Sequence, residues 1–169
     1  METTCLIRKM QTSDVKELSQ GFINQGWPGR EEILIRYFKE QESGEREVLI
    51  ADLTSAVAGY ITILPDAKQG PFAGMGPELS DFNVFEPFQN QGIGNLLMEE
   101  AEKRVKLISD KVTLGVGLHS GYGPAQRLYI KRGYIPDGSG VWYRNHRPTM
   151  DATCEDIGDL VLYLSKDLI

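Results

Sequence analysis

The chain has 169 residues, of which 41% are hydrophobic and 25% are charged, and its formal net charge is −6. This length and composition suit a single globular domain with a full core, so we expect one domain over residues 1–169. The negative charge argues against a nonspecific nucleic-acid binder, and no segment approaches the roughly 18 uninterrupted apolar residues of a membrane helix.

The N-terminus and the two cysteines indicate the cellular compartment. The first ten residues, METTCLIRKM, lack a long apolar core and a cleavage site, so we expect no secretory signal and a cytoplasmic protein. Cys5 and Cys154 lie far apart in sequence and form no CxxC motif. We therefore expect two reduced thiols, with no disulfide and no metal site.

The first half of the chain predicts two helices followed by a hairpin. Apolar residues recur at helical spacing in two segments, and Thr12 or Ser13 can cap the first of them. The expected elements are a strand at 5–9, a helix at 12–22, a helix at 31–42, and hairpin strands at 47–52 and 56–64 joined by 53–55.

Two loops in this part of the chain leave alternatives open. Trp27, between the two helices, either anchors the helix pair in the core or lines a substrate pocket. The segment 66–77 is rich in glycine and proline and too long for an ordinary connection. It is either a mobile lid over a ligand or a floppy surface insertion.

The second half predicts alternating strands and helices without an internal repeat or an interdomain linker. Gly133 is expected to end the last helix, and residues 141–143 could form a strand within the otherwise polar segment 138–155. The remaining expected elements are a strand at 79–85, a helix at 93–107, a strand at 112–118, a helix at 125–131 and a strand at 160–164.

The segment 89–94, reading QNQGIG, joins an expected strand to an expected helix. Its glycines allow close approach of an anion, which the backbone N–H groups and the positive end of the helix dipole would hold. A dinucleotide fingerprint would need a third glycine at Leu97, and the chain has no GxxxxGK[ST] loop. The segment therefore predicts a different phosphate site, or a glycine-rich corner without a ligand.

Gln89, Gly92 and Gly94 match the pattern [Gln/Arg]-x-x-Gly-x-[Gly/Ala], with Val84 five residues upstream, and 125–134 matches Ala-x-x-Leu-Tyr-x-x-x-Gly-[Phe/Tyr]. These two motifs, in this order, resemble those of the GNAT superfamily of acyl-CoA-dependent N-acyltransferases. The resemblance covers nearly the whole chain. It implies an α/β (α+β) fold with a mixed, mostly antiparallel central sheet flanked by helices, whose fourth and fifth strands splay apart at the CoA site.

The resemblance implies acetyl-CoA as the acyl donor. Its pyrophosphate would bind the glycine turn, and its pantetheine arm would pair with the preceding strand. Three residues before Ala125 the family usually has an asparagine that contacts the cofactor, where this chain has Tyr122, so that contact falls to Ser120 or Tyr122 or is absent. The implied cofactor residues are Val84, Phe85, Gln89, Asn90, Gln91, Gly92, Ile93, Gly94, Asn95, Ser120 and Tyr122.

The catalytic groups are also implied by the resemblance. Tyr129 matches the tyrosine that acts as general acid toward the departing thiolate, although it could instead be an ordinary packed helix residue. A backbone N–H near Val84 is the expected oxyanion donor. The general base is Glu78, Asp81 or a chain of water molecules; alternation places Glu78 on the face of Val84 and Asp81 on the opposite face.

Together these features predict an N-acetyltransferase that acts on a primary amine of a small molecule or peptide by direct attack in a ternary complex. The acceptor would be bordered by the Trp27 loop, 66–77 and 138–147, and His119 is a candidate substrate contact. No metal, nucleic acid or membrane is implied, and a homodimer is left open. The alternatives are a noncatalytic acyl-CoA-binding or sensor module on the same fold and a structural interaction domain.

Overall fold

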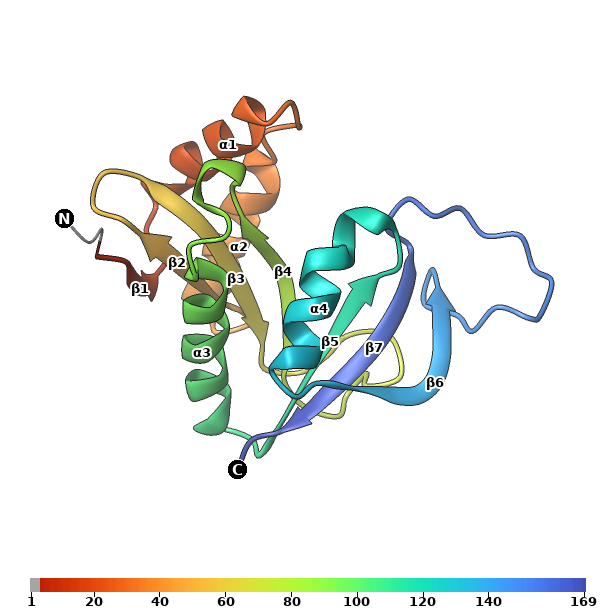
Figure 1. Ribbon diagram of the computed structural model, residues 1–169. Helices are drawn as coiled ribbons and strands as arrows, with labels where there is room; N and C mark the ends of the chain where they lie inside the picture. Colours follow the sequence, from red (N-terminus) through yellow and green to blue (C-terminus); the bar gives the residue numbers. More distant parts are fainter. Residues whose placement is uncertain (1–3) are drawn as a thin grey trace. The chain divides into compact units, whose positions relative to one another are not determined.

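The computed structural model describes residues 4–169 and has a mixed α/β fold (Figure 1). The strands are hydrogen-bonded in the order β1-β2-β3-β4-β5-β7-β6. Strands β4 and β5 pair in parallel, whereas the other registered pairs are antiparallel. The predicted mixed, mostly antiparallel sheet with flanking helices is therefore confirmed. None of the helices within 4–169 combines the length and apolar character needed to span a bilayer.

The chain divides into two compact units, and the first comprises 4–64 and 80–104 of the described residues. It holds the two N-terminal helices, the predicted hairpin and the glycine turn. Its elements are β1 (Leu6–Lys9), α1 (Asp14–Asn24), α2 (Glu31–Ser43), β2 (Glu47–Asp52), β3 (Val57–Leu64), most of β4 (Glu78–Val84), the 3₁₀ turn η1 (Glu86–Phe88) and most of α3 (Ile93–Lys106).

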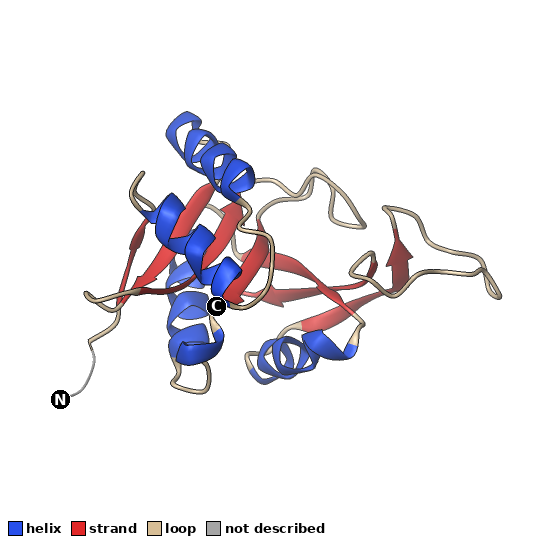
Figure 2. Cartoon of the chain, turned by 90° about the horizontal axis from the view of Figure 1, so that it is seen from above, coloured by secondary structure: helices blue, strands red, loops and turns tan. Residues whose placement is uncertain are grey.

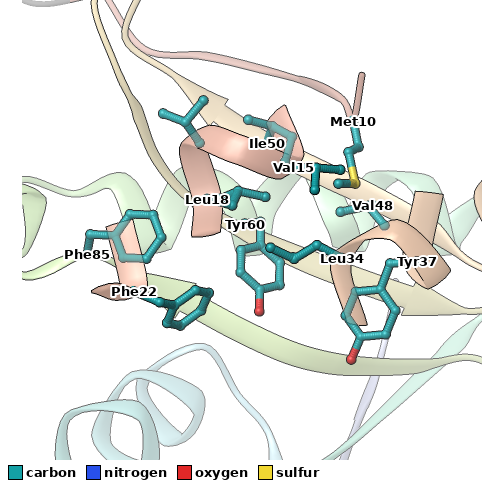
Figure 3. Close-up of a cluster of buried hydrophobic side chains, with 11 residues drawn as sticks. Met10, Val15, Leu18, Phe22, Leu34, Tyr37, Val48, Ile50, Tyr60 and Phe85 are labelled. Atoms are coloured by element: carbon teal, nitrogen blue, oxygen red, sulfur yellow. The ribbon is translucent and has the colours of Figure 1, made fainter. Parts of the chain in front are cut away.

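The core of this unit lies between the helices and the sheet. Helices α1 and α2 pack together and against β2 and β3, while α3 lies on the opposite face of these strands (Figures 1 and 2). Alternate side chains of β2 therefore enter different cores, and both faces of the strand are buried. The core under α1 and α2 consists of Met10, Val15, Leu18, Phe22, Leu34, Tyr37, Val48, Ile50, Val57, Tyr60 and Phe85 (Figure 3).

The second unit comprises 65–79 and 105–169. Strand β5 pairs with β7 along its whole length, and β6 pairs with β7 with an irregularity between Pro136 and Val141. The tentative strand at 141–143 is thus the end of a longer one. The elements are the start of β4, β5 (Lys111–Gly117), the 3₁₀ turn η2 (Ser120–Tyr122), α4 (Gly123–Lys131), β6 (Ile135–Tyr143) and β7 (Leu160–Asp167).

The loop at 66–77 is closed by its own backbone. The Ala67 N–H donates to the carbonyl of Gly76 at 2.8 Å, and the Gly74 N–H donates to the carbonyl of Ala67 at 2.8 Å. The loop is also bound to the turn that follows β6, because the Gly70 N–H donates to Asn145 Oδ1 at 2.7 Å. These bonds join the loop to itself and to the segment that follows β6, and both roles expected for it, a lid or a surface insertion, stay predictions.

Two local predictions differ from the structure. Ser13 occupies the N-cap position of α1, but its side chain makes no capping hydrogen bond because its backbone is already helical, with φ −62° and ψ −27°. The Asp14 carboxylate instead accepts the N–H of Gln11 at 2.7 Å. Trp27 has 62% of its surface exposed, so it does not anchor the helix pair in the core.

Candidate active site

The glycine turn leads from β4 through η1 into α3. Asn90 and Gly92 have φ of 60° and 83°, both in the left-handed region, which a glycine adopts without steric cost. Residues 89–92 are exposed, whereas Ile93, the first residue of α3, is buried and anchors the turn to the core. The turn is therefore an exposed stretch of backbone that is fixed to the core at Ile93.

The polar groups of the turn suit an anion. Its glutamine side chains donate to carbonyls of the chain itself, Gln89 to Val84 at 2.8 Å and Gln91 to Pro87 at 3.1 Å. The N–H groups of the first turn of a helix have no intrahelical partner, and the first turn of α3 contains no acidic residue. The positive end of α3 thus has no carboxylate of its own first turn to compete with an anion, which suits a pyrophosphate.

At the end of β4, the backbone groups of neighbouring residues point to opposite edges of the strand. The Phe85 N–H donates to the carbonyl of Ala58 on β3 at 2.9 Å, and the Phe85 carbonyl accepts the N–H of Phe88 at 2.9 Å. Because N–H groups of neighbouring residues in a strand point to opposite edges, the N–H of Val84 points away from β3. The Val84 N–H therefore suits the expected pairing with pantetheine, whereas the Val84 carbonyl already accepts the Gln89 side chain and both backbone groups of the buried Phe85 have partners in the chain.

Asp81 lies at the centre of a polar network in the first unit. Its carboxylate accepts two N–H bonds from Arg30, at 2.7 and 3.2 Å, and the hydroxyl of Tyr37 at 2.9 Å. Asn83 Nδ2 donates to it at 3.0 Å, and the Arg30 guanidinium also donates to Tyr60 Oη at 2.7 Å. Accepting a proton at Asp81 would disrupt this ion pair, which argues against its predicted role as general base.

The sequence did not reveal this network. Arg30 precedes α2 with a left-handed φ of 61°, and its guanidinium lies over the Phe22 ring, 5.1 Å from the ring centre. Asp81 itself has a φ of 48°, which interrupts the strict alternation on which the predicted common face of 78–84 depended. Burial raises the pKa of the Tyr37 and Tyr60 hydroxyls, so both remain protonated at neutral pH.

Glu78, the other predicted base, belongs to the second unit and is 8% exposed. It is in register with Thr113 of β5, and Gly115 of β5 is in register with Tyr163 of β7. Thr113 and Gly115 are two residues apart and share a face of the sheet, so Glu78 and Tyr163 project from that same face. Burial, together with the charge of Glu78, raises the pKa of Tyr163.

Tyr129 lies on α4 in the second unit. Its side chain is 7% exposed, and its ring centre is 6.0 Å from that of Tyr134. Gly133, with a φ of 93°, ends the helix as predicted, and the Tyr134 N–H returns to the carbonyl of Tyr129 at 3.0 Å. Burial raises the pKa of the Tyr129 hydroxyl, which keeps its proton at neutral pH and has one to donate.

The segment that leads into α4 contains the Tyr122 ring and a histidine that caps η2. The Tyr122 ring lies over Gly117, where an added Cβ would come within 2.5 Å of it, while Ser120 is exposed. His119 Nδ1 accepts the Gly121 N–H at 3.0 Å, so this histidine caps η2. Tyr122 and Ser120 as cofactor contacts and His119 as a substrate contact stay predictions.

A groove of about 430 Å³ lies in the first unit, between α1, the hairpin turn and η1. Phe85 is in its lining, whereas the turn residues 89–94 are not. A Cβ on Gly21 would come within 2.5 Å of the Phe85 ring, so this glycine lets the ring pack beneath α1. The residues that line the groove thus do not include those of the predicted phosphate site.

Solved structures resemble this chain over nearly its whole length. A GNAT-family protein from Desulfovibrio desulfuricans has a TM-score of 0.74 at 16% identity, covering 98% of this chain and 100% of the other. The ribosomal-protein-S18-alanine N-acetyltransferase of Escherichia coli has a TM-score of 0.69 at 15% identity, with coverage of 98% and 94%. The protein yncA of Salmonella typhimurium, solved with its cofactor acetyl-CoA, has the same values. At these identities the likeness establishes the fold.

Sequence comparison identifies the family. No curated protein sequence matches this chain. The family model for the acetyltransferase (GNAT) domain matches residues 21–148, which include both motifs and most of the described strands. The chain therefore belongs to the GNAT family of acetyltransferases.

Proposed function

We propose that this chain transfers the acetyl group of acetyl-CoA to a primary amine of a small molecule or peptide, by direct attack in a ternary complex. The observation that carries the proposal is the glycine turn at 89–94, whose residues 89–92 are exposed and which leads into α3 with no acidic residue in the first helical turn. A diphosphate with two adjacent negative groups matches such a site. Membership of the GNAT family supports acetyl-CoA as the donor.

Three groups of the chain carry out the proposed steps of the transfer. The Val84 N–H stabilises the oxyanion as the amine nitrogen bonds to the acetyl carbon. The carbon–sulfur bond then breaks, and Tyr129 donates its proton to the departing thiolate. Glu78 accepts the proton that the amine loses. We prefer Glu78 to Asp81 for this step because the Asp81 carboxylate is held by Arg30 and Tyr37.

Calorimetric titration with acetyl-CoA tests the donor half. Gly92→Val puts a branched side chain where φ is 83°, so the turn must change its backbone, and we expect affinity to fall at least about 10-fold, equal to about 1.4 kcal/mol. Gly44→Val is the matched control, because Gly44 has a φ of 81° and equally open space at the end of α2. Equal affinities of the two variants, or no binding by the parent at millimolar acetyl-CoA, would contradict the proposal.

Thiol release across a panel of primary amines tests the transfer itself. Tyr129→Phe removes only the hydroxyl, so acetyl-CoA affinity should stay within about twofold while kcat falls about 100-fold. Tyr134→Phe makes the same change on the neighbouring buried ring and should keep the parental rate. A Tyr129→Phe enzyme as fast as the parent at every pH would show that the tyrosine is not the acid. Binding of acetyl-CoA without release for any amine would favour the noncatalytic sensor.

A further inference from the structure

The groove in the first unit has walls from three segments of the chain. The hairpin turn contributes residues 55–57, and the end of β4 together with η1 contributes 85–88. Its volume of about 430 Å³ lies within the range of roughly 300–1,000 Å³ that is usual for small-molecule sites. The third wall is one face of α1, whose lining residues recur at spacings of three and four: Glu17, Gln20, Gly21 and Asn24.

Ring packing and a hydrogen bond hold two of these walls in place. The Phe85 ring is 3% exposed and meets the Phe22 ring edge-on, with 5.1 Å between the ring centres (Figure 3). The Glu86 N–H donates to Gln25 Oε1 at 2.6 Å, which joins the end of α1 to η1. The groove is therefore formed before a ligand enters, which lowers the entropic cost of binding.

The polar groups of the groove are mainly hydrogen-bond acceptors. Glu17 and Glu86 are exposed, and among the described residues neither carboxylate has a hydrogen-bond or ion-pair partner in the chain. Gln20 uses an N–H of its amide on Asn24 Oδ1 at 2.8 Å, which keeps its own amide oxygen available as an acceptor. Within 4–169, no lysine, arginine or histidine lines the groove. The lining thus carries two negative charges and no positive charge to balance them.

These groups favour one class of ligand. Both carboxylates would repel an anion, and a neutral molecule would gain little over the water that it displaces from them. A cation with N–H donors gains charge-assisted hydrogen bonds to the same carboxylates. The apolar side chains of Val57, Phe85 and Phe88 line the same groove and suit an apolar body attached to that cation.

We propose that this groove is a second small-molecule site, which binds an organic cation with N–H donors and an apolar body, paired with the Glu17 and Glu86 carboxylates. The lining includes neither the glycine turn nor Tyr129, so the ligand is bound there and is not a reactant in the proposed acetyl transfer. Binding at the groove requires neither acetyl-CoA nor an acceptor.

The binding test compares three benzene derivatives of nearly equal size: benzamidine, which is a cation at neutral pH, neutral benzamide and anionic benzoate. In ¹⁵N–¹H spectra of the full chain, benzamidine should shift and saturate the backbone resonances of Gly21, Ser55 and Glu86. Because each exposed carboxylate adds a modest ion pair, we expect half saturation at a benzamidine concentration at least about 5-fold below that of benzamide, and no saturation with benzoate. Equal values for benzamidine and benzamide, or shifts confined to residues outside the groove, would overturn the proposal.

Variants of the carboxylates test the ion pairs. Glu17→Gln and Glu86→Gln keep the side-chain shape, and each should raise the benzamidine concentration at half saturation about 2- to 5-fold while leaving that of benzamide unchanged. Glu31→Gln is the matched control, because it removes an exposed carboxylate of the same unit, in the first turn of α2 and outside the lining. An effect of Glu31→Gln as large as that of Glu17→Gln would show a response to net charge alone and refute the site.

A larger side chain inside the groove tests its shape. Ala56 is half-buried on the hairpin turn, and Ala56→Leu should weaken benzamidine and benzamide alike, about 3-fold or more, with an unchanged circular dichroism spectrum. Unchanged affinities in this variant would place the ligand elsewhere.

Acetyl-CoA distinguishes the groove from the predicted cofactor site. Saturating acetyl-CoA should leave the benzamidine concentration at half saturation within about twofold of its value without acetyl-CoA. Displacement of benzamidine by acetyl-CoA would place the ligand in the cofactor site and overturn the proposal. If the chain binds no acetyl-CoA, the proposed function fails, and the titrations of the Glu17 and Glu86 variants still decide whether the groove is a site.

Discussion

Replacing Asp81 by asparagine tests the network that holds the middle of β4. Asparagine keeps the size of the side chain and tolerates the φ of 48°, so the substitution removes charge without adding backbone strain. It leaves the Arg30 guanidinium without its anion and puts an amide NH₂ group where a carboxylate oxygen accepted donors. The hydroxyl of Tyr37 loses a charged acceptor in the same change.

The size of the effect follows from the burial of the pair. Removing one partner of a fully buried ion pair costs about 3–5 kcal/mol. Here the Asp81 side chain is 14% exposed and that of Arg30 is 26% exposed, so water partly solvates the remaining charge. We therefore expect a loss of about 2–3 kcal/mol in the free energy of unfolding. For a chain of this length that lowers the Tm by roughly 4–12 °C.

Urea unfolding measured by circular dichroism gives this free energy, with Lys103→Ala as control. Lys103 forms an ion pair with Glu99 on the surface of α3, and exposed pairs of this kind contribute little, so the midpoint should stay at the parental value. A loss below about 0.5 kcal/mol in Asp81→Asn would refute the view that the network stabilises the fold. A turnover that falls 100-fold in folded Asp81→Asn would restore Asp81 as the general base.

Three further predictions concern backbone and charge. Gly59→Ala should destabilise by about 3 kcal/mol in urea unfolding, because its Cβ would lie 2.2 Å from a backbone oxygen of β4; a loss below 1 kcal/mol would mean that the strands separate easily. Gly133→Ala should cost about 1 kcal/mol at its φ of 93°, and an unchanged Tm would contradict this. The hydrogen bond from Arg8 lowers the pKa of Asp52 in the folded chain. The ionised Asp52 therefore stabilises the fold above the pKa of the unfolded chain, and this stabilisation is lost as the pH falls through the pKa of the folded chain. The stability difference between the parent and Asp52→Asn should therefore shrink toward acid pH, and a constant difference would contradict the pairing.

The elements were predictable because their signals are local. Apolar residues at helical spacing placed the second helix at 31–42, and it runs over Glu31–Ser43. The first helix was expected at 12–22 and spans Asp14–Asn24, a shift of two residues at each end. Several polar residues near its start could have capped the helix, and Ser13 at the N-cap position makes no side-chain capping bond, so the sequence did not fix the first residue.

The network at Asp81 could not be predicted, because its members are distant in sequence. Arg30 and Asp81 are 51 residues apart, and neither lies in a motif that would relate them. The left-handed φ of each is not encoded by a glycine, so the sequence carries no sign of it. Trp27 had two possible positions from the sequence, in the core or lining a pocket, and its 62% exposed surface excludes the first, since the core under the helices is formed by other residues, among them Tyr60 and Leu34.

The sequence reveals the donor half of the proposed reaction more readily than the acceptor half. The proposed phosphate site is made of backbone groups, whose geometry favours glycine at Gly92, so a spacing pattern is enough to predict it. The acceptor half depends on side chains, and the position of its proposed base depends on the strand register that brings Glu78 and Tyr163 to one face. No spacing pattern in the sequence marks that register. The acceptor half therefore becomes arguable only once the pairing of β4, β5 and β7 is known.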